Sequence, residues 1–183
     1  MNHAVFTHEN SKEITRLKKA FVEERTCDEF VPCPTELKST VSPNRDGTQV
    51  AELIEKYGHA DWYSFNTSEW GTKWDFGGQK DDILESKRGR VVLRFDTAWA
   101  PPVVFYEKME ELGFTVEAYY YEPGMNFCGK FYDGNDDYYE IPSTSEEAAD
   151  QLPSDIDEMF SISEYMADRE AEEDENERDC NDE

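Results

Sequence analysis

The sequence predicts an α+β fold in which an antiparallel sheet carries helices on one face. Residues 90–96 and 114–121 are rich in β-branched and aromatic side chains, which favour strands, and a helical pattern separates them. Residues 127–141 predict a hairpin, since two short aromatic strands flank a turn signal. Strand, helix, strand and hairpin in this order form a split βαβ pattern.

The N-terminal part of the chain is predicted to hold one strand and one helix. Residues 4–7 have the composition of a short strand, and Asn10 or Ser11 is expected to cap the helix that follows. This helix has apolar side chains at helical spacing, namely Ile14, Leu17, Phe21 and Val22. Residues 30–37 are expected to be extended, because each of their prolines restrains the preceding residue to β or polyproline geometry.

Two further helices are predicted before the central strands. Thr48 is expected to cap a helix over residues 49–57, which ends at Gly58. The rings of residues 62–70 recur at approximately helical spacing and predict a second, short helix. Residues 76–87 contain two adjacent glycines and several charges, and are expected to form a loop.

The helix between the two central strands has clear signals at both ends. Pro101 and Pro102 open it, since proline at the first helical position lacks only a donor that would be unpaired anyway. Gly113 is the expected C-cap. The apolar stripe between these ends consists of Val104, Phe105, Met109 and Leu112.

Charge divides the chain into two parts. Residues 1–142 form the predicted α+β domain, and residues 143–183 form a predicted acidic helical extension. The extension carries 17 acidic and 2 basic residues, and therefore about −15 of the formal net charge of −25. Ser145 and Pro153 are expected to begin short helices. From Arg169 onward only charge remains, which favours a frayed or disordered end.

Composition argues against several classes of function. A formal net charge of −25 disfavours direct binding of nucleic acid or of anionic membranes, because affinity for phosphate comes mainly from Lys and Arg. No apolar run approaches the roughly 20 residues that span a bilayer, and the N-terminus lacks the features of a signal peptide. A cytoplasmic protein is therefore expected. Its four cysteines have no CxxC spacing and are expected to be reduced thiols, so neither a metal site nor a cofactor is predicted.

Three spaced motifs stand out in the centre of the chain. Residues 70–74 have the sequence W-G-T-K-W, residues 95–102 the sequence F-D-T-A-W-A-P-P, and residues 121–129 the sequence Y-E-P-G-M-N-F-C-G. Carboxylates that converge in space serve acid–base chemistry or hold a divalent ion. The candidate ligand-binding residues in and beside the motifs are Lys73, Asp75, Asp96 and Glu122.

A structural role for the same residues is the alternative interpretation. Asp96 would then cap the following helix or fix its turn, and Lys73 would pair with a carboxylate. Trp70, Trp74 and Trp99 would pack in the core. No catalytic residue is assigned, because no motif brings a histidine or cysteine to these acids.

In these motifs the chain resembles the YubB-type proteins, a ferredoxin-like family encoded on plasmids and phages. The family pattern begins with an aspartate–tryptophan helix start, here Asp61-Trp62-Tyr63, and continues with the three motifs in the same order. The resemblance covers roughly residues 30–141 and implies a ferredoxin-like fold for the domain. It also implies an accessory role in mobile elements, where some members accompany genes that blunt host defence. It implies no activity, and the acidic extension lies outside the family pattern.

The first functional hypothesis is a non-enzymatic phage or plasmid accessory protein that binds a host protein. The expected partner is a basic nucleic-acid-binding or defence protein, which the chain would inhibit through a DNA-like acidic surface. The alternative is that the negative charge serves only to keep the protein soluble. The expected contact residues of the extension are Asp155, Ile156, Met159, Phe160, Glu164 and Met166.

Two hypotheses of other classes remain open. One is a metal- or nucleotide-binding enzyme that uses the carboxylates of the motif region, with Asp75, Asp96 and Glu122 in the site. The other is a binder of single-stranded nucleic acid, in which Tyr119, Tyr120 and Tyr121 stack on bases. Such a platform normally lies in a positively charged groove, and few cations accompany these tyrosines in the sequence.

Overall fold

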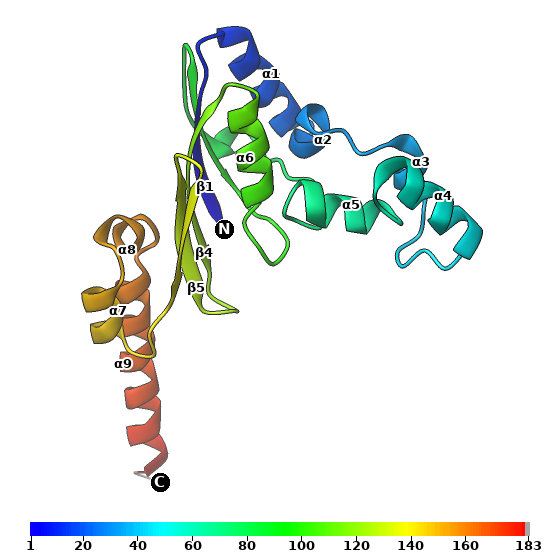
Figure 1. Ribbon diagram of the computed structural model, residues 1–183. Helices are drawn as coiled ribbons and strands as arrows, with labels where there is room; N and C mark the ends of the chain where they lie inside the picture. Colours follow the sequence, from blue (N-terminus) through cyan, green and yellow to red (C-terminus); the bar gives the residue numbers. More distant parts are fainter. Residues whose placement is uncertain (182–183) are drawn as a thin grey trace. The chain divides into compact units, whose positions relative to one another are not determined.

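The computed structural model describes the backbone of residues 1–181 and the side chains of residues 1–173 (Figure 1). Its contacts define two compact units. The first comprises Met1–Ala118 and Phe131–Asp136, and the second comprises Tyr119–Lys130 and Asp137–Glu183. No helix in the described part of the chain is long and apolar enough to cross a membrane.

A six-stranded antiparallel sheet, in the order β2-β3-β1-β4-β5-β6, confirms the α+β class. β1 pairs antiparallel with β3, with Ala4 opposite Leu93 and Phe6 opposite Val91. The strands are β1 (Asn2–Thr7), β2 (Ile83–Lys87), β3 (Arg90–Phe95), β4 (Thr115–Glu122), β5 (Phe127–Tyr132) and β6 (Asn135–Glu140). The strands expected at residues 4–7, 90–96 and 114–121 therefore exist, with ends that differ by one or two residues.

The turn between β5 and β6 has the backbone that its sequence predicts. Asp133 and Gly134 have φ angles of 50° and 70°. Two successive positive φ angles are typical of the tight hairpin turn whose twist matches that of its strands, and Asp-Gly is a favoured pair there. The predicted hairpin is confirmed.

The loop predicted over residues 76–87 is wrong in its second half. Ile83–Lys87 forms the edge strand β2, which pairs antiparallel with β3. None of its residues is fully buried, and its sequence, I-L-E-S-K, lacks the alternation of apolar and polar residues by which a half-buried strand is recognised. Arg88 and Gly89 make the connecting turn, with Gly89 at φ 79°.

The helices of the first unit are α1 (Ser11–Val22), α2 (Thr26–Phe30), α3 (Thr35–Lys38), α4 (Gly47–Tyr57), α5 (Trp62–Glu69) and α6 (Val103–Glu111). Of these, α1, α4 and α5 each follow an N-cap residue whose side chain caps the helix. Asn10 caps α1 by accepting a hydrogen bond from the Lys12 amide. Asp61 and Ser64 form a reciprocal capping box at the start of α5.

Two predictions about helix starts need correction. Asp46, not Thr48, caps α4, and its carboxylate accepts hydrogen bonds from the amides of Thr48 and Gln49. Residues 30–37 are not wholly extended, because α3 begins at Thr35 directly after Pro34. Proline restrains the residue before it but is well suited to a helix start, so Pro34 ends one segment and opens the next.

The first core lies between one face of the sheet and helices α1 and α6, which Figure 1 shows beside β1. Phe76 stacks on Phe95 with ring centroids 4.0 Å apart, and Phe6 meets Tyr106 edge to face. The sheet contributes Ala4, Phe6, Val91, Leu93 and Phe95, and the two helices contribute Ile14, Leu17, Phe21, Phe105, Tyr106 and Met109. The aromatic content of the sequence is thus used largely for packing.

The second unit has its own core. Helices α7 (Ser145–Gln151), α8 (Ser154–Phe160) and α9 (Ile162–Asn181) form most of it. The buried residues are Tyr119, Cys128, Ala148, Leu152, Ile156, Ile162 and Met166. The second unit therefore also includes parts of β4, β5 and β6, whereas the charge pattern divides the chain after residue 142. A frayed or disordered end is predicted from Arg169 onward, whereas α9 continues as a helix to Asn181, and residues 182 and 183 lie outside the described residues.

Candidate functional site

The clearest exposed feature of the first unit is a group of aromatic rings around the ammonium of Lys73. The ammonium lies 4.6 Å from the ring centroid of Trp74, 4.9 Å from that of Trp99 and 6.0 Å from that of Tyr63. Trp74 is 53% exposed and Trp99 is 62% exposed. We call Tyr63, Lys73, Trp74 and Trp99 the Lys73 cluster. Two sequence motifs, W-G-T-K-W and F-D-T-A-W, meet in it.

Helix α5 supports one side of the Lys73 cluster. Tyr63 lies in its first turn, which the Asp61 capping box fixes. Trp62 packs against the first core and stacks on Trp74, with ring centroids 4.9 Å apart and planes 19° from parallel. The Asn66 amide donates a hydrogen bond of 2.9 Å to the Lys73 carbonyl and holds the backbone beside the cluster.

The turn that presents Lys73 is anchored at its start. Trp70 is buried, and its indole N–H donates a hydrogen bond of 2.8 Å to the carbonyl of Val31. Gly71 follows at φ 77°, where a Cβ atom would lie 3.2 Å from the amide nitrogen of Val104. A side chain at this position would meet both backbone strain and a close contact, so glycine is required.

Trp99 is held by an unusual backbone conformation. Its φ angle is 67°, in the left-handed region that costs an L-residue about 1–2 kcal/mol. Thr97 stabilises the loop through two hydrogen bonds. Its hydroxyl donates one of 2.8 Å to the Ala100 carbonyl and accepts one of 2.9 Å from the side-chain amide of Asn2. Local strain of this kind is typical of functional positions.

The structure corrects three parts of the structural interpretation of the motifs. Only Trp70 is a core residue, whereas Trp74 and Trp99 are more than half exposed. Lys73 contacts rings and forms no ion pair with the carboxylates whose side chains are described. Asp96 does not cap α6, since Pro102 occupies the N-cap position without a side-chain hydrogen bond.

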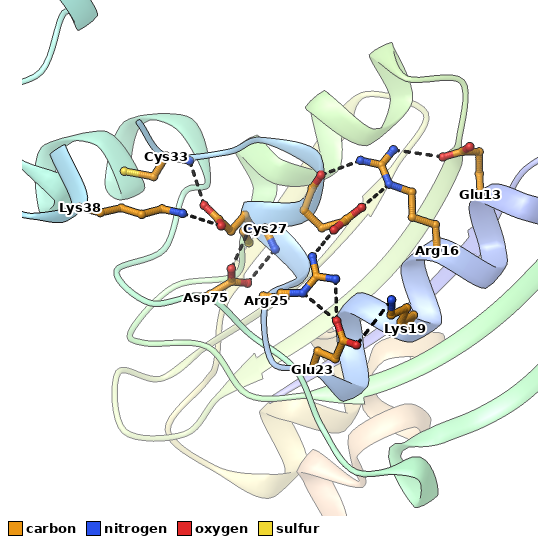
Figure 2. A network of polar contacts seen from close by, with 11 residues as sticks. Glu13, Arg16, Lys19, Glu23, Arg25, Cys27, Cys33, Lys38 and Asp75 are labelled. Atoms are coloured by element: carbon orange, nitrogen blue, oxygen red, sulfur yellow. Dashed lines mark hydrogen bonds and ion pairs between the residues drawn. The ribbon is translucent and has the colours of Figure 1, made fainter. Parts of the chain in front are cut away.

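Asp75 lies beside Lys73 in sequence but serves helix α2. Its carboxylate accepts hydrogen bonds from the amides of Cys27 (2.7 Å), Asp28 (2.9 Å) and Phe76 (2.8 Å). Figure 2 shows it beneath the start of the helix. Burial raises the pKa of this carboxyl. Its oxygens are occupied by backbone donors, so Asp75 acts as a helix cap.

The surroundings of α2 are a salt-bridge network (Figure 2). The Glu29 carboxylate accepts hydrogen bonds from Arg16 and Arg25, and these bonds lower its pKa. The Asp28 carboxylate accepts from the Cys33 amide at 3.0 Å and from Lys38 at 2.6 Å. These contacts fix the segment that carries the Asp75 cap.

The other two candidate carboxylates have separate surroundings. The side chain of Asp96 is 87% exposed, and its carboxylate lies 3.5 Å from the Met1 nitrogen. Glu122 belongs to the second unit, where it accepts a hydrogen bond of 3.0 Å from the Gly124 amide within a turn. Among the described residues no group of three or more His, Cys, Asp or Glu is arranged to hold a metal ion.

The contact residues expected in the C-terminal helices are mostly occupied inside the second unit. Ile156 is 1% exposed and Met166 is 9% exposed, both in the second core. The ring of Phe160 packs against Tyr121, with centroids 5.7 Å apart. The Asp155 carboxylate accepts a hydrogen bond of 3.1 Å from the Lys130 ammonium. Met159 and Glu164 are exposed, and Asp155 is exposed as well despite its contact with Lys130.

The three consecutive tyrosines are also part of the second unit. Tyr120 is 2% exposed and packs edge to face with Phe127. Tyr119 is buried beneath the ammonium of Lys130, 4.7 Å from its ring centroid. Rings in these positions have little face available for a nucleic-acid base.

Comparisons with known proteins give no relative from which a role could be transferred. No family model matches the chain, and neither a curated protein nor a solved structure is similar to it. The case for a site therefore depends on the geometry of the Lys73 cluster. Both motifs are conspicuous in the sequence, but two of their tryptophans, Trp74 and Trp99, are exposed and not packed in the core.

Proposed function

We propose that this chain is a non-enzymatic binding protein that contacts another protein through the Lys73 cluster. The observation that carries the proposal is the exposure of Trp74 and Trp99 around one lysine. Tryptophan is enriched among the residues that dominate binding energy at protein interfaces. The Trp62 stack supports the ring of Trp74, and the Thr97 hydrogen bond supports the loop that carries Trp99.

The charge of the chain favours a basic partner. At a formal net charge of −25, long-range attraction speeds association with a positively charged protein and disfavours nucleic acid. Exposed acidic residues of α7 and α9 supply part of this field, namely Glu146, Glu147, Asp150, Glu164, Asp168, Glu172 and Glu173. Because resemblance to YubB-type proteins suggests a mobile-element accessory role, we propose a host nucleic-acid-binding or defence protein as the partner, with inhibition as the outcome.

We further propose a ferredoxin-like arrangement for the first four strands. Along the chain, β1 is followed by helices, then by the β2–β3 hairpin, α6 and β4. The strand order β2-β3-β1-β4 and the antiparallel pairing of β1 with β3 support this assignment. The β5–β6 hairpin then extends the sheet beyond β4.

Capture of proteins from a bacterial lysate at low salt tests the proposed function. The full chain, a Trp74→Ala/Trp99→Ala double variant and a Tyr165→Ala control are immobilised at equal density. Tyr165 is 58% exposed in α9, so the control also removes an exposed ring. We expect the double variant to capture at least about tenfold less of a partner that the control still captures. Interface tryptophans often contribute about 2 kcal/mol or more to binding. Equal capture by all three proteins would contradict the proposal.

A thermal-shift screen addresses the enzyme alternative. A ligand present at about 100 times its dissociation constant adds roughly 2.7 kcal/mol of stability. We expect Mg²⁺, Mn²⁺ and nucleotides to leave the melting temperature unchanged, because Asp75, Asp96 and Glu122 each have separate local roles. A clear shift that an Asp96→Asn variant abolishes would favour the enzyme instead.

A further inference from the structure

The Lys73 cluster has the composition of a site for a cation. Aromatic ring faces carry negative charge density and attract an ammonium or guanidinium group within about 6 Å of the ring centroid. Here three ring centroids lie within 6.0 Å of one ammonium, at 4.6, 4.9 and 6.0 Å. In the free protein that ammonium comes from the chain itself.

Two features make the rings independent of the lysine that they surround. Trp74 is fixed from behind by its stack on Trp62, which packs against the first core. The loop that carries Trp99 is held by the Thr97 hydrogen bonds to Ala100 and Asn2. Neither support involves the Lys73 side chain. The rings are therefore expected to keep their places when the lysine moves away.

Lys73 is also suited to leave. Its charge is not neutralised by any carboxylate whose side chain is described, so departure breaks no ion pair. Its ammonium is attached to a flexible four-carbon stem and regains hydration in water. Cation–π contacts at exposed sites are weak, so exchange of one cation for another costs little.

We propose that the Lys73 cluster is a cation site occupied by its own lysine, and that an arginine or lysine side chain of a basic partner displaces Lys73 on binding. The proposal rests on the proposed function and names the chemical group that the partner inserts. Charge complementarity supports this occupant, because the chain carries 43 acidic and 18 basic residues and attracts positively charged proteins. A nucleic-acid base stacked on Trp99 is the competing occupant, and the net charge disfavours it.

Titration with tetramethylammonium chloride tests the displacement without a known partner. The indole N–H resonances are followed by ¹⁵N–¹H NMR at constant ionic strength, with Trp74→Phe and Trp99→Phe variants to assign the signals. Wild type, Lys73→Ala and Lys73→Arg proteins are compared. Neutral neopentyl alcohol, which has nearly the same shape as the cation, controls for simple apolar contact, and oligo-dT controls for base stacking.

We expect tetramethylammonium to shift the Trp74 and Trp99 signals and to bind Lys73→Ala about fivefold more tightly than wild type, because the internal competitor is gone. Lys73→Arg should bind like wild type. Equal affinity of wild type and Lys73→Ala, or equal shifts with neopentyl alcohol, would overturn the proposal. Saturable shifts with oligo-dT and none with the cation would do so too. If Lys73→Ala melts at lower temperature, Lys73→Gln replaces it.

The two proposals fail in different ways. Loss of partner capture in the Trp74→Ala/Trp99→Ala variant, together with unchanged cation affinity in Lys73→Ala, would leave the binding function and remove the displacement mechanism. Retained capture in the double variant would remove the binding function itself. Tighter capture of the partner by Lys73→Ala than by wild type is the result expected if both proposals are correct.

Discussion

The ammonium of Lys73 lies 4.9 Å from the ring centroid of Trp99, although the two residues come from separate sequence motifs. The contact joins the turn after α5 to the loop between β3 and α6. Both residues are on the surface, so the contact contributes little to the core. Because the same ammonium also contacts Trp74, two exposed tryptophans lie beside one lysine.

Replacement of Trp99 separates backbone strain from ring contacts. Trp99→Ala and Trp99→Gly both remove the ring, but only glycine accepts a φ of 67° without cost. We expect the glycine variant to be about 1 kcal/mol more stable than the alanine variant in urea unfolding. If alanine were the more stable of the two, the left-handed backbone at this position would be refuted.

Asp75 is expected to matter for stability rather than for ligand binding. Asp75→Ala leaves three amides without their acceptor and should lower the free energy of unfolding by about 1–2 kcal/mol. Asp75→Asn should cost less, because its amide oxygen still accepts hydrogen bonds. Urea titrations of both variants at neutral pH measure the difference, with Asp81→Ala, an exposed acid in the same unit, as the control.

The difference in stability between wild type and Asp75→Asn is expected to change with pH in a defined direction. Burial raises the folded-state pKa of Asp75 above its ordinary value of 3.8, so the folded protein binds this proton more tightly than the unfolded chain does. The stability of wild type relative to Asp75→Asn should therefore fall as pH rises from 3.8 through the folded-state pKa. A rise over the same interval would mean that hydrogen bonds outweigh burial.

The cysteines with described side chains are predicted to react slowly. Burial raises the pKa of Cys33 to about 11 and that of Cys128 to about 11, and it raises the pKa of Cys27 as well. Since the thiolate is the nucleophile, disulfide-exchange reagents at pH 8 should modify these three only after unfolding. Mass spectrometry after timed labelling measures the rates. Rapid labelling of Cys27 in the native protein would contradict its burial.

The helices of the second unit offer a matched pair of substitutions. Ile156 is in the second core, whereas Met159 on the same helix is 39% exposed. Ile156→Ala should cost about 2–4 kcal/mol and Met159→Ala less than about 0.5 kcal/mol. Thermal melting of both variants measures this. Similar losses for both residues would mean that the helix faces are assigned wrongly.

Much of the architecture follows from local sequence. The strands β3 and β4 have strong side-chain patterns, and the caps at Asn10 and Asp61 act through hydrogen bonds within the next turn. The edge strand β2 was missed because its stability comes from pairing with β3, which no local pattern reveals. Long-range pairing of this kind overrides a loop-like composition.

The candidate site was harder to predict for a related reason. A tryptophan is usually buried, so the sequence favoured a core position for Trp74 and Trp99, and only the fold reveals their exposure. For the apolar stripe of the C-terminal helices the error is the reverse, since residues predicted to be exposed are buried. Ile156 and Met166 were expected to face a partner, yet parts of β4 and β5 supply the surface that they cover within the second unit.

Site-specific photo-cross-linking tests directly whether the Lys73 cluster contacts a partner protein. A benzophenone amino acid is introduced at Trp99 in one protein and at Tyr165 in another, since both side chains are well exposed. Both proteins are irradiated in the same bacterial lysate at low salt. We expect a specific cross-linked protein from position 99 and none of comparable yield from position 165. Cross-links from position 165 alone would contradict it.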